Sequence, residues 1–228
     1  IPLSSLDRRV VFRSTDKVES PHFSPDDSAL YFNRNGRIHR LPLDAGAVPE
    51  TIDTGFARKC STTHAISPDG TTLLFEDLTS GKSLMYLMPL RGGEPRPVGV
   101  PGPAFGHGWS PDGKTLAYCA EREGNYDIYT VPVEVGLETR LTTDSGIDSG
   151  CDYTPDGKWI YFHTPRTGRV QIWRMQPDGS NQEPVTNDDF ENWFPHPSAN
   201  GEWIVFLSSK VKPDTGHPPE GDYLLRLL

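Results

Sequence analysis

Residues 110–113 read Ser110-Pro111-Asp112-Gly113, a tetrapeptide that closes a tight turn. Proline presets φ at the second position, aspartate bonds to the nearby backbone, and glycine supplies the positive φ. The same motif, or a close variant, occurs five times and begins at residues 24, 67, 110, 154 and 198. These starts lie 43, 43, 44 and 44 residues apart. Such regular spacing indicates a tandem repeat that covers the whole chain.

The first and last copies of the motif depart from the consensus in ways that a turn tolerates. Asp27 stands where glycine is expected, and aspartate reaches a positive φ at modest cost. The last copy, Ser198-Ala199-Asn200-Gly201, lacks proline but keeps Asn-Gly, which is itself a hairpin signal. We therefore expect a turn at all five positions.

Every turn is followed by a β-rich run, a polar loop and a second β-rich run. The first runs cover residues 29–32, 72–75, 115–118, 159–162 and 203–206, and the second cover 37–41, 84–88, 127–131, 171–175 and 223–227. An apolar segment before each turn and a short polar segment after the second run add two further strands. Repeats of four antiparallel strands over about 43 residues are typical of propeller blades. The alternative is a β-sandwich in which the spacing arises by chance.

We therefore predict an all-β protein, a single domain over residues 1–228, built as a β-propeller of five four-stranded antiparallel blades. Residues 8–12 have the pattern of a fourth strand without its three partners, and the chain ends on a third strand. The N-terminal strand is expected to complete the last blade and close the ring, because closure removes exposed sheet edges. The alternative is a six-bladed parent that lacks one blade.

The composition restricts the class of partner. The net charge is −9, from 31 acidic and 22 basic residues, with no block of Lys and Arg, so we expect no nucleic-acid partner. The longest apolar runs are far shorter than the ~20 residues that span a bilayer, so no membrane association is expected. The three cysteines are an odd number without CxxC spacing. They slightly favour a cytoplasmic over a periplasmic location.

The repeats, with Ser-Pro-Asp-Gly ahead of a hydrophobic strand, resemble those of the TolB-like β-propeller family. Residues 107–113 and 192–197 resemble segments of bacterial TolB-like proteins, and the resemblance extends over essentially the whole chain. It implies a scaffold similar to the TolB C-terminal domain that binds a protein or peptide, and family members usually carry six blades. Nothing in the chain resembles the separate N-terminal α/β domain of TolB, so TolB's lipoprotein partner is not carried over.

Candidate site residues fall in the innermost strands, which line the central channel of a propeller. Three residues before the motif stand His64, His107 and Cys151 in successive blades, and nearby loops add charged and amide side chains. We predict a ligand-binding site at the channel mouth formed by His22, His64, His107, Asp148, Cys151, Asp152, Asn192 and His196. The competing interpretation is a narrow solvated channel whose polar groups bond to water or backbone.

His64, His107 and Cys151 are also candidate ligands for a divalent metal, because imidazole and thiolate suit zinc. Their spacing is not diagnostic, and no cofactor is otherwise expected. The chain contains no GxSxG elbow, P-loop, GxGxxG or HExxH motif. The leading hypothesis is therefore a monomeric, non-catalytic scaffold that binds a protein, a peptide or a small ligand in the channel. The alternative is a hydrolase or lyase that uses the His-rich mouth.

Overall fold

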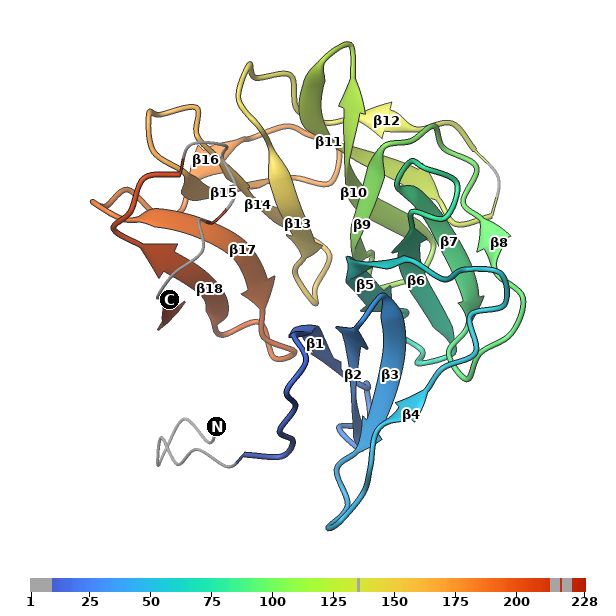
Figure 1. The fold of residues 1–228 in the computed structure, drawn as a ribbon. Helices are drawn as coiled ribbons and strands as arrows, with labels where there is room; N and C mark the ends of the chain where they lie inside the picture. The colour runs from blue at the N-terminus through green and yellow to red at the C-terminus, as the bar shows by residue number, and fades with distance from the viewer. Residues whose placement is uncertain (1–9, 135, 214–217, 219–222) are drawn as a thin grey trace.

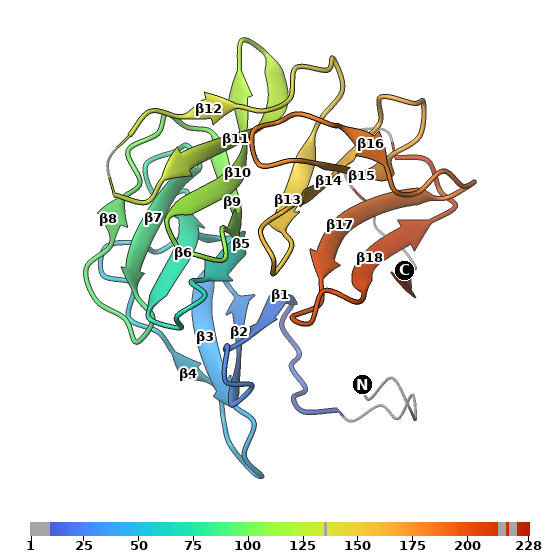
Figure 2. The ribbon, with the colours of Figure 1, turned by 180° about the vertical axis from the view of Figure 1, so that it is seen from behind.

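The computed structural model describes residues 10–134, 136–213, 218 and 223–228. Five antiparallel sheets stand side by side in a ring, which Figures 1 and 2 show from opposite sides. This confirms the predicted all-β propeller of five blades. No helix in the described ranges is long and apolar enough to cross a membrane.

Each blade begins with the strand nearest the centre of the ring (Figure 1). These inner strands are β1 (Val18–Phe23), β5 (Cys60–Ile66), β9 (Ala104–Trp109), β13 (Ser149–Tyr153) and β17 (Glu191–Pro197). The second strands are β2 (Ala29–Arg34), β6 (Thr72–Asp77), β10 (Thr115–Arg122), β14 (Ile160–Thr164) and β18 (Ile204–Ser209). The third strands are β3 (Arg37–Pro42), β7 (Leu84–Pro89), β11 (Asn125–Pro132), β15 (Gln171–Met175) and β19 (Leu224–Leu227). The outer strands of blades 1 to 4 are β4 (Glu50–Thr51), β8 (Arg96–Pro97), β12 (Thr139–Arg140) and β16 (Glu183–Pro184).

The five motif turns share one hydrogen-bond pattern. In the third copy the Ser110 hydroxyl donates to Asp112 Oδ1 at 2.6 Å, and the same carboxylate oxygen accepts the Lys114 N–H at 3.1 Å. The other four copies repeat both bonds. Glycine at the last position has φ of +70° in four turns, and Asp27 takes +56° in the first. The local chemistry of the tetrapeptide thus fixes each link between the first and second strands.

A second repeated contact joins each blade to the next. The side chain nine residues after the start of the motif, on the second strand, bonds to the backbone at or just before the following inner strand. The contacts are Asn33 Nδ2 to the Cys60 carbonyl (2.9 Å), Gly106 N–H to Glu76 Oε1 (2.5 Å), Cys119 Sγ to the Asp148 carbonyl (3.2 Å) and Phe194 N–H to His163 Nδ1 (3.4 Å). Four different side chains therefore each connect one blade to the next.

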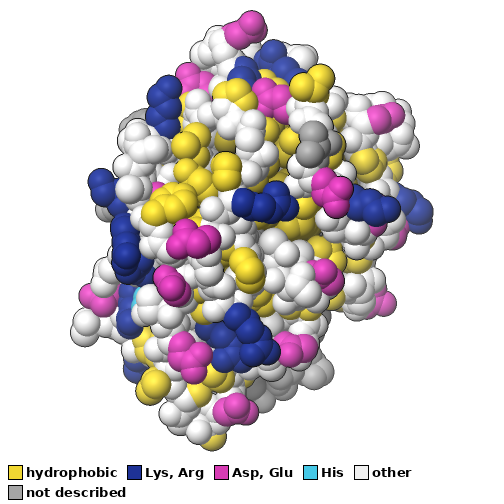
Figure 3. Space-filling view, turned by 90° about the vertical axis from the view of Figure 1, so that its right-hand side faces the viewer, with side chains coloured by type: hydrophobic (Ala, Val, Ile, Leu, Met, Phe, Trp, Pro, Cys, Tyr) yellow, Lys and Arg dark blue, Asp and Glu magenta, His cyan; other side chains and the backbone are white. Residues whose placement is uncertain are grey.

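The hydrophobic core is divided among the spaces between consecutive blades. Tyr31 and Ile38 of blade 1 pack in one cluster with Leu73 and Phe75 of blade 2, and three further clusters join the later pairs of blades. A blade by itself would leave these faces exposed, so burial of apolar area between blades stabilises the ring. On the outside near β7 and β8, acidic and basic side chains are interspersed (Figure 3).

The N-terminal segment differs from the prediction. Blade 5 has three strands in the described part of the chain, and residues 10–12 form no strand. The Phe12 ring instead stacks on Phe32 of β2, with centroids 5.6 Å apart, and the Arg34 guanidinium lies 5.8 Å from the same ring. For residues 10–12 the predicted closing strand is therefore wrong, because aromatic and cation–π contacts hold Phe12 on blade 1. Arg8 and Arg9 lie outside the described residues.

Candidate functional site

Every inner strand carries a break in its pairing register a few residues before its turn. In three blades the residue at the break has a positive φ: Ser20 (49°), Gly150 (62°) and Phe194 (52°). Such bulges bend a strand and re-aim the side chains that follow. The residues that follow include the predicted site residues His22, His64, Asp152 and His196, all on the turn side of the break.

The structure brings these four side chains, from blades 1, 2, 4 and 5, into one cluster. The ring centroids of His22 and His64 lie 4.9 Å apart, and those of His22 and His196 lie 6.0 Å apart in an edge-to-face arrangement. His196 Nδ1 lies 3.1 Å from Asp152 Oδ2. We call His22, His64, Asp152 and His196 the axial cluster. It is confined to the end of the inner strands that leads into the motif turns.

Accessibility falls from the edge of the axial cluster to its base. The side chain of His196 is 48% exposed, Asp152 is 27% exposed, and His22 is half-buried. His64 is only 2% exposed, and neither of its ring nitrogens makes a well-formed hydrogen bond in the described structure, although the Tyr31 backbone carbonyl lies close to the ring. Leaving a buried polar atom unpaired costs roughly 1–3 kcal/mol, so such atoms are uncommon outside functional sites.

Burial and mutual repulsion keep the inner imidazoles uncharged. Burial lowers the pKa of His22 well below its ordinary value, and the neighbouring His64, His196 and His107 lower it further. Burial lowers the pKa of His64 to about 4, although the Tyr31 carbonyl favours its protonated form. At neutral pH the inner rings therefore offer neutral donors, acceptors and aromatic surface.

His107 and Cys151, which share a repeat position with His64, lie in different surroundings. His107 is half-buried and close enough to His22 to depress that pKa. Cys151 is fully buried in the apolar cluster between blades 3 and 4, beside Ala117 and Cys119. Burial raises the pKa of its thiol well above the ordinary value, so it is not the thiolate that a metal requires.

Asp148 and Asn192 are also separate from the axial cluster. Asp148 is buried, and its Oδ2 pairs with the Arg166 guanidinium at 2.9 Å. Asn192 is buried in β17, where it donates to Gln171 Oε1 at 3.1 Å and accepts the Ser208 hydroxyl at 2.5 Å. Both side chains hold strands and loops together, and Asp148 Oδ1 is buried without a hydrogen-bond partner in the described structure.

The residues present do not fit the metal site that the sequence suggested. Within the described ranges, no group of three or more His, Cys, Asp or Glu side chains is placed to hold a metal ion. His22 and His64 meet ring against ring at an interplanar angle of 58°. Among the described residues neither of these two rings accepts a hydrogen bond from a serine, threonine or cysteine side chain.

Sequence reasoning missed a buried carboxyl group close to the inner strands. Glu76 is fully buried; it accepts the N–H of Gly106 and the hydroxyl of Thr63. Burial raises its pKa to about 8, against the opposing effect of these hydrogen bonds. The sequence contains a signal for this buried carboxyl group. Glu76 directly follows the apolar run 73–75 and occupies the repeat position of the blade-to-blade contact.

The ring of repeated blades, with its functional candidates on the inner strands, defines a β-propeller. Residues 46–215 match the TolB beta propeller domain, so the chain belongs to this family. An uncharacterized protein of Agrobacterium fabrum, Atu1656, is 44% identical over 96% of this chain and 75% of its own length.

Two further comparisons agree with this assignment. The solved structure of a TolB-like protein from Agrobacterium tumefaciens superposes with a TM-score of 0.93 at 44% identity, covering 96% of this chain and 79% of the other. The TolB homolog of Chlorobaculum tepidum is 32% identical over 50% of this chain, but this match spans only 26% of that protein. The predicted TolB-like resemblance is confirmed.

Proposed function

We propose that this protein is a non-catalytic binding propeller whose axial cluster holds a segment of a protein or peptide partner. The proposal rests on His64, which is buried at the base of the axial cluster and whose two ring nitrogens lack well-formed hydrogen bonds. A ligand that hydrogen-bonds to this ring removes the cost of leaving it unpaired.

The chemistry of the axial cluster suits a peptide. Backbone N–H and C=O groups complement neutral imidazoles, which donate from one nitrogen and accept at the other. His196 and Asp152 at the accessible edge add a donor and a negative charge. The rigid ring holds these groups in place before binding, which reduces the entropy lost when a partner is ordered.

Membership of the TolB family supports this binding role, since the resemblance to the TolB C-terminal domain implies a scaffold that binds a protein or peptide. The side chains that the structure gathers are binding groups without an adjacent nucleophile. We therefore favour binding over the hydrolase or lyase alternative.

A random peptide library selected on the immobilised protein tests the proposal. Affinities of the selected peptides are then measured for the wild type and for the variants His64→Leu and His196→Ala. We expect each substitution to weaken binding about tenfold or more, because it removes a hydrogen bond at the site. The control is His39→Gln, which alters a histidine of β3 outside the axial cluster. Recovery of no binding sequence, or equal affinity for the wild type and both cluster variants, would contradict the proposal.

A further inference from the structure

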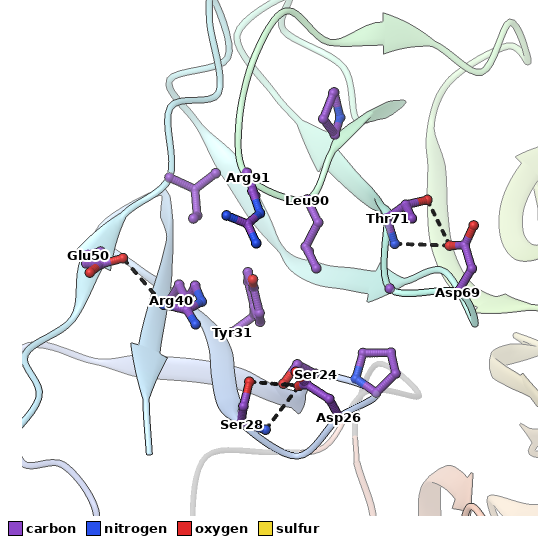
Figure 4. Close-up of a pocket in the computed structure, with 14 residues that line it drawn as sticks. Ser24, Asp26, Ser28, Tyr31, Arg40, Glu50, Asp69, Thr71, Leu90 and Arg91 are labelled. Carbon is purple, nitrogen blue, oxygen red and sulfur yellow. Dashed lines mark hydrogen bonds and ion pairs between the residues drawn. The ribbon is translucent and has the colours of Figure 1, made fainter. Parts of the chain in front are cut away.

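A second site lies between blades 1 and 2, where the first two motif turns approach each other. The pocket there has a volume of about 740 Å³ and is lined by Tyr31, Arg40, Leu90 and Arg91, among others. Figure 4 shows the guanidinium groups of Arg40 and Arg91 on the same side of the pocket as Tyr31. This volume lies within the range of small-molecule sites in proteins.

A polar row crosses the whole width of blade 1 and ends in this pocket. His22 of β1 pairs directly with Tyr31 of β2, Tyr31 with Arg40 of β3, and Arg40 with Glu50 of β4. Directly paired residues in antiparallel strands lie on the same face of the sheet. The Tyr31 ring packs in the cluster shared with blade 2, so this face of blade 1 is the one that turns toward blade 2.

Blade 4 has the same row of directly paired residues, which are Asp152, Tyr161, Arg174 and Glu183. In blade 4 the Arg174 guanidinium lies 4.2 Å over the ring of Trp159 and bonds to Glu183 through two nitrogens, at 2.7 and 2.5 Å.

The repeat position of Trp159 is occupied in blade 1 by Ala29, five residues after the start of the motif. Arg40 therefore lacks the indole on which Arg174 stacks, and its side chain lines the pocket. Blade 2 contributes Arg91 to the same pocket, directly after Leu90.

The pocket lining carries two guanidiniums, Arg40 and Arg91, and three carboxylates, Asp26, Glu50 and Asp69. An anionic group is therefore favoured only on the side where the guanidiniums lie (Figure 4). Arg40 makes a loose ion pair with Glu50, at 3.6 Å, and the Glu50 side chain is 63% exposed. Arg91 has no ion-pair or hydrogen-bond partner among the residues that the structure describes. Asp26 and Asp69 bond within their own turns, and in Figure 4 they lie across the pocket from the two arginines. The exposed Arg91 guanidinium is thus without a contacting counter-charge, whereas the carboxylates nearby disfavour a doubly charged anion.

We propose that this pocket binds a carboxylate group attached to a short apolar body. Guanidinium groups match the geometry of a carboxylate, and the Tyr31 hydroxyl adds a donor. The apolar wall contributed by Leu90 and Ile52 accommodates the hydrocarbon part of the ligand. The carboxylate belongs either to a free organic acid or to the C-terminus of a peptide. This proposal does not depend on the axial cluster.

Titration of the intact protein with hexanoate, followed by NMR chemical-shift changes, tests the site. Hexanol serves as the uncharged analogue of the same length. We expect hexanoate to bind at least about tenfold more tightly than hexanol, and Arg91→Gln to remove that difference, because a hydrogen bond to a charged group is lost. Arg91 is exposed, so this variant should fold. The matched control Arg174→Gln alters the equivalent of Arg40 in blade 4 and should leave hexanoate binding unchanged.

A tripeptide, acetyl-Gly-Leu-Leu, with either a free carboxylate or an amide at its C-terminus, distinguishes the two sources. Tighter binding of the free acid form than of hexanoate assigns the pocket to peptide C-termini, whereas tighter binding of hexanoate assigns it to free acids. Equal binding of hexanoate and hexanol, or equal losses in the Arg91 and Arg174 variants, would overturn the proposal. The absence of any binding would also overturn it.

Discussion

The imidazole ring of His22 lies 4.9 Å from that of His64, although the two residues belong to different blades and neither ring is charged at neutral pH. The contact is possible because a bulge in each inner strand precedes each histidine. It also links protein stability to pH, since protonation of one ring repels the other.

Replacement of His64 by leucine should stabilise the protein. The substitution removes two unpaired buried nitrogens, worth roughly 1–3 kcal/mol, and retains most of the apolar volume. Because the folded pKa of about 4 lies below the ordinary 6.5, the unfolded state binds more protons between these values. Wild-type stability should therefore decline as pH falls through that window, by up to about 1.4 kcal/mol per pH unit from this group.

Urea unfolding of the wild type and His64→Leu at several pH values measures both effects. The stability difference should widen from pH 7 to pH 4. The largely exposed His196 provides the control, and His196→Leu should change stability by less than about 1 kcal/mol. A His64→Leu variant less stable than the wild type at pH 5 would show that the ring nitrogens of His64 are hydrogen-bonded in solution.

Replacement of Glu76 by glutamine should stabilise the protein increasingly as pH rises. The folded pKa of about 8 lies above the ordinary 4.5, so the folded state holds a proton that the unfolded state has released. The contribution of Glu76 to the stability of the wild type is therefore lost as pH rises from about 4.5 to about 8. Glutamine does not titrate, so the variant does not lose stability in this way. Thermal unfolding between pH 5 and 9 measures the change.

Glu191 provides the contrasting case for Glu76. It is also buried, but it pairs with Arg169 at 3.0 Å and accepts the Val170 N–H at 2.6 Å. Glu191→Gln removes an ion pair and should destabilise the protein. If both glutamine variants shift the melting temperature in the same direction, the interpretation of Glu76 is wrong.

Gly150→Ala should be far more costly than Gly157→Ala, although both glycines have positive φ, of 62° and 70°. An added Cβ at Gly150 would lie 2.6 Å from His163 Nδ1, whereas at Gly157 the nearest atom is 3.6 Å away. We expect a loss of about 1 kcal/mol at Gly157, from backbone strain alone. At Gly150 the loss should be roughly 2–4 kcal/mol, because overpacking adds to the strain. Denaturant melts of the two variants give the comparison directly, and equal losses would rule out a tight packing role for Gly150.

Arg166→Met should destabilise the protein by roughly 3–5 kcal/mol at neutral pH, because it leaves the buried Asp148 carboxylate without its partner. Burial raises the pKa of Asp148 to about 6, so protonation below that pH removes the charge. The penalty should therefore be smaller at pH 5 than at pH 8. Adding Asp148→Asn should restore part of the loss, as a double-mutant cycle would show. A penalty that does not change with pH would mean that Asp148 is not the group responsible.

The repeated unit follows from local sequence alone. The motif turns depend on hydrogen bonds between residues two to five positions apart, so Ser110-Pro111-Asp112-Gly113 specifies its turn wherever it stands. Alternating apolar runs then predict the strands, and the fixed spacing predicts the blades. The propeller could be predicted from the sequence because these interactions are short-range.

Which equivalent residues meet could be seen only in the folded protein. His64 and Cys151 occupy the same repeat position, yet one contacts His22 and the other lies in an apolar cluster. Cys151 lies within the register break of β13, whereas His64 follows the break of β5. Trp193 is fully buried in β17. Likewise, the pocket between blades 1 and 2 brings together Tyr31 and Arg40 of one blade and Arg91 of the next. Packing between blades joins residues about 40 positions apart, and no local pattern records which side chains will face one another across that distance.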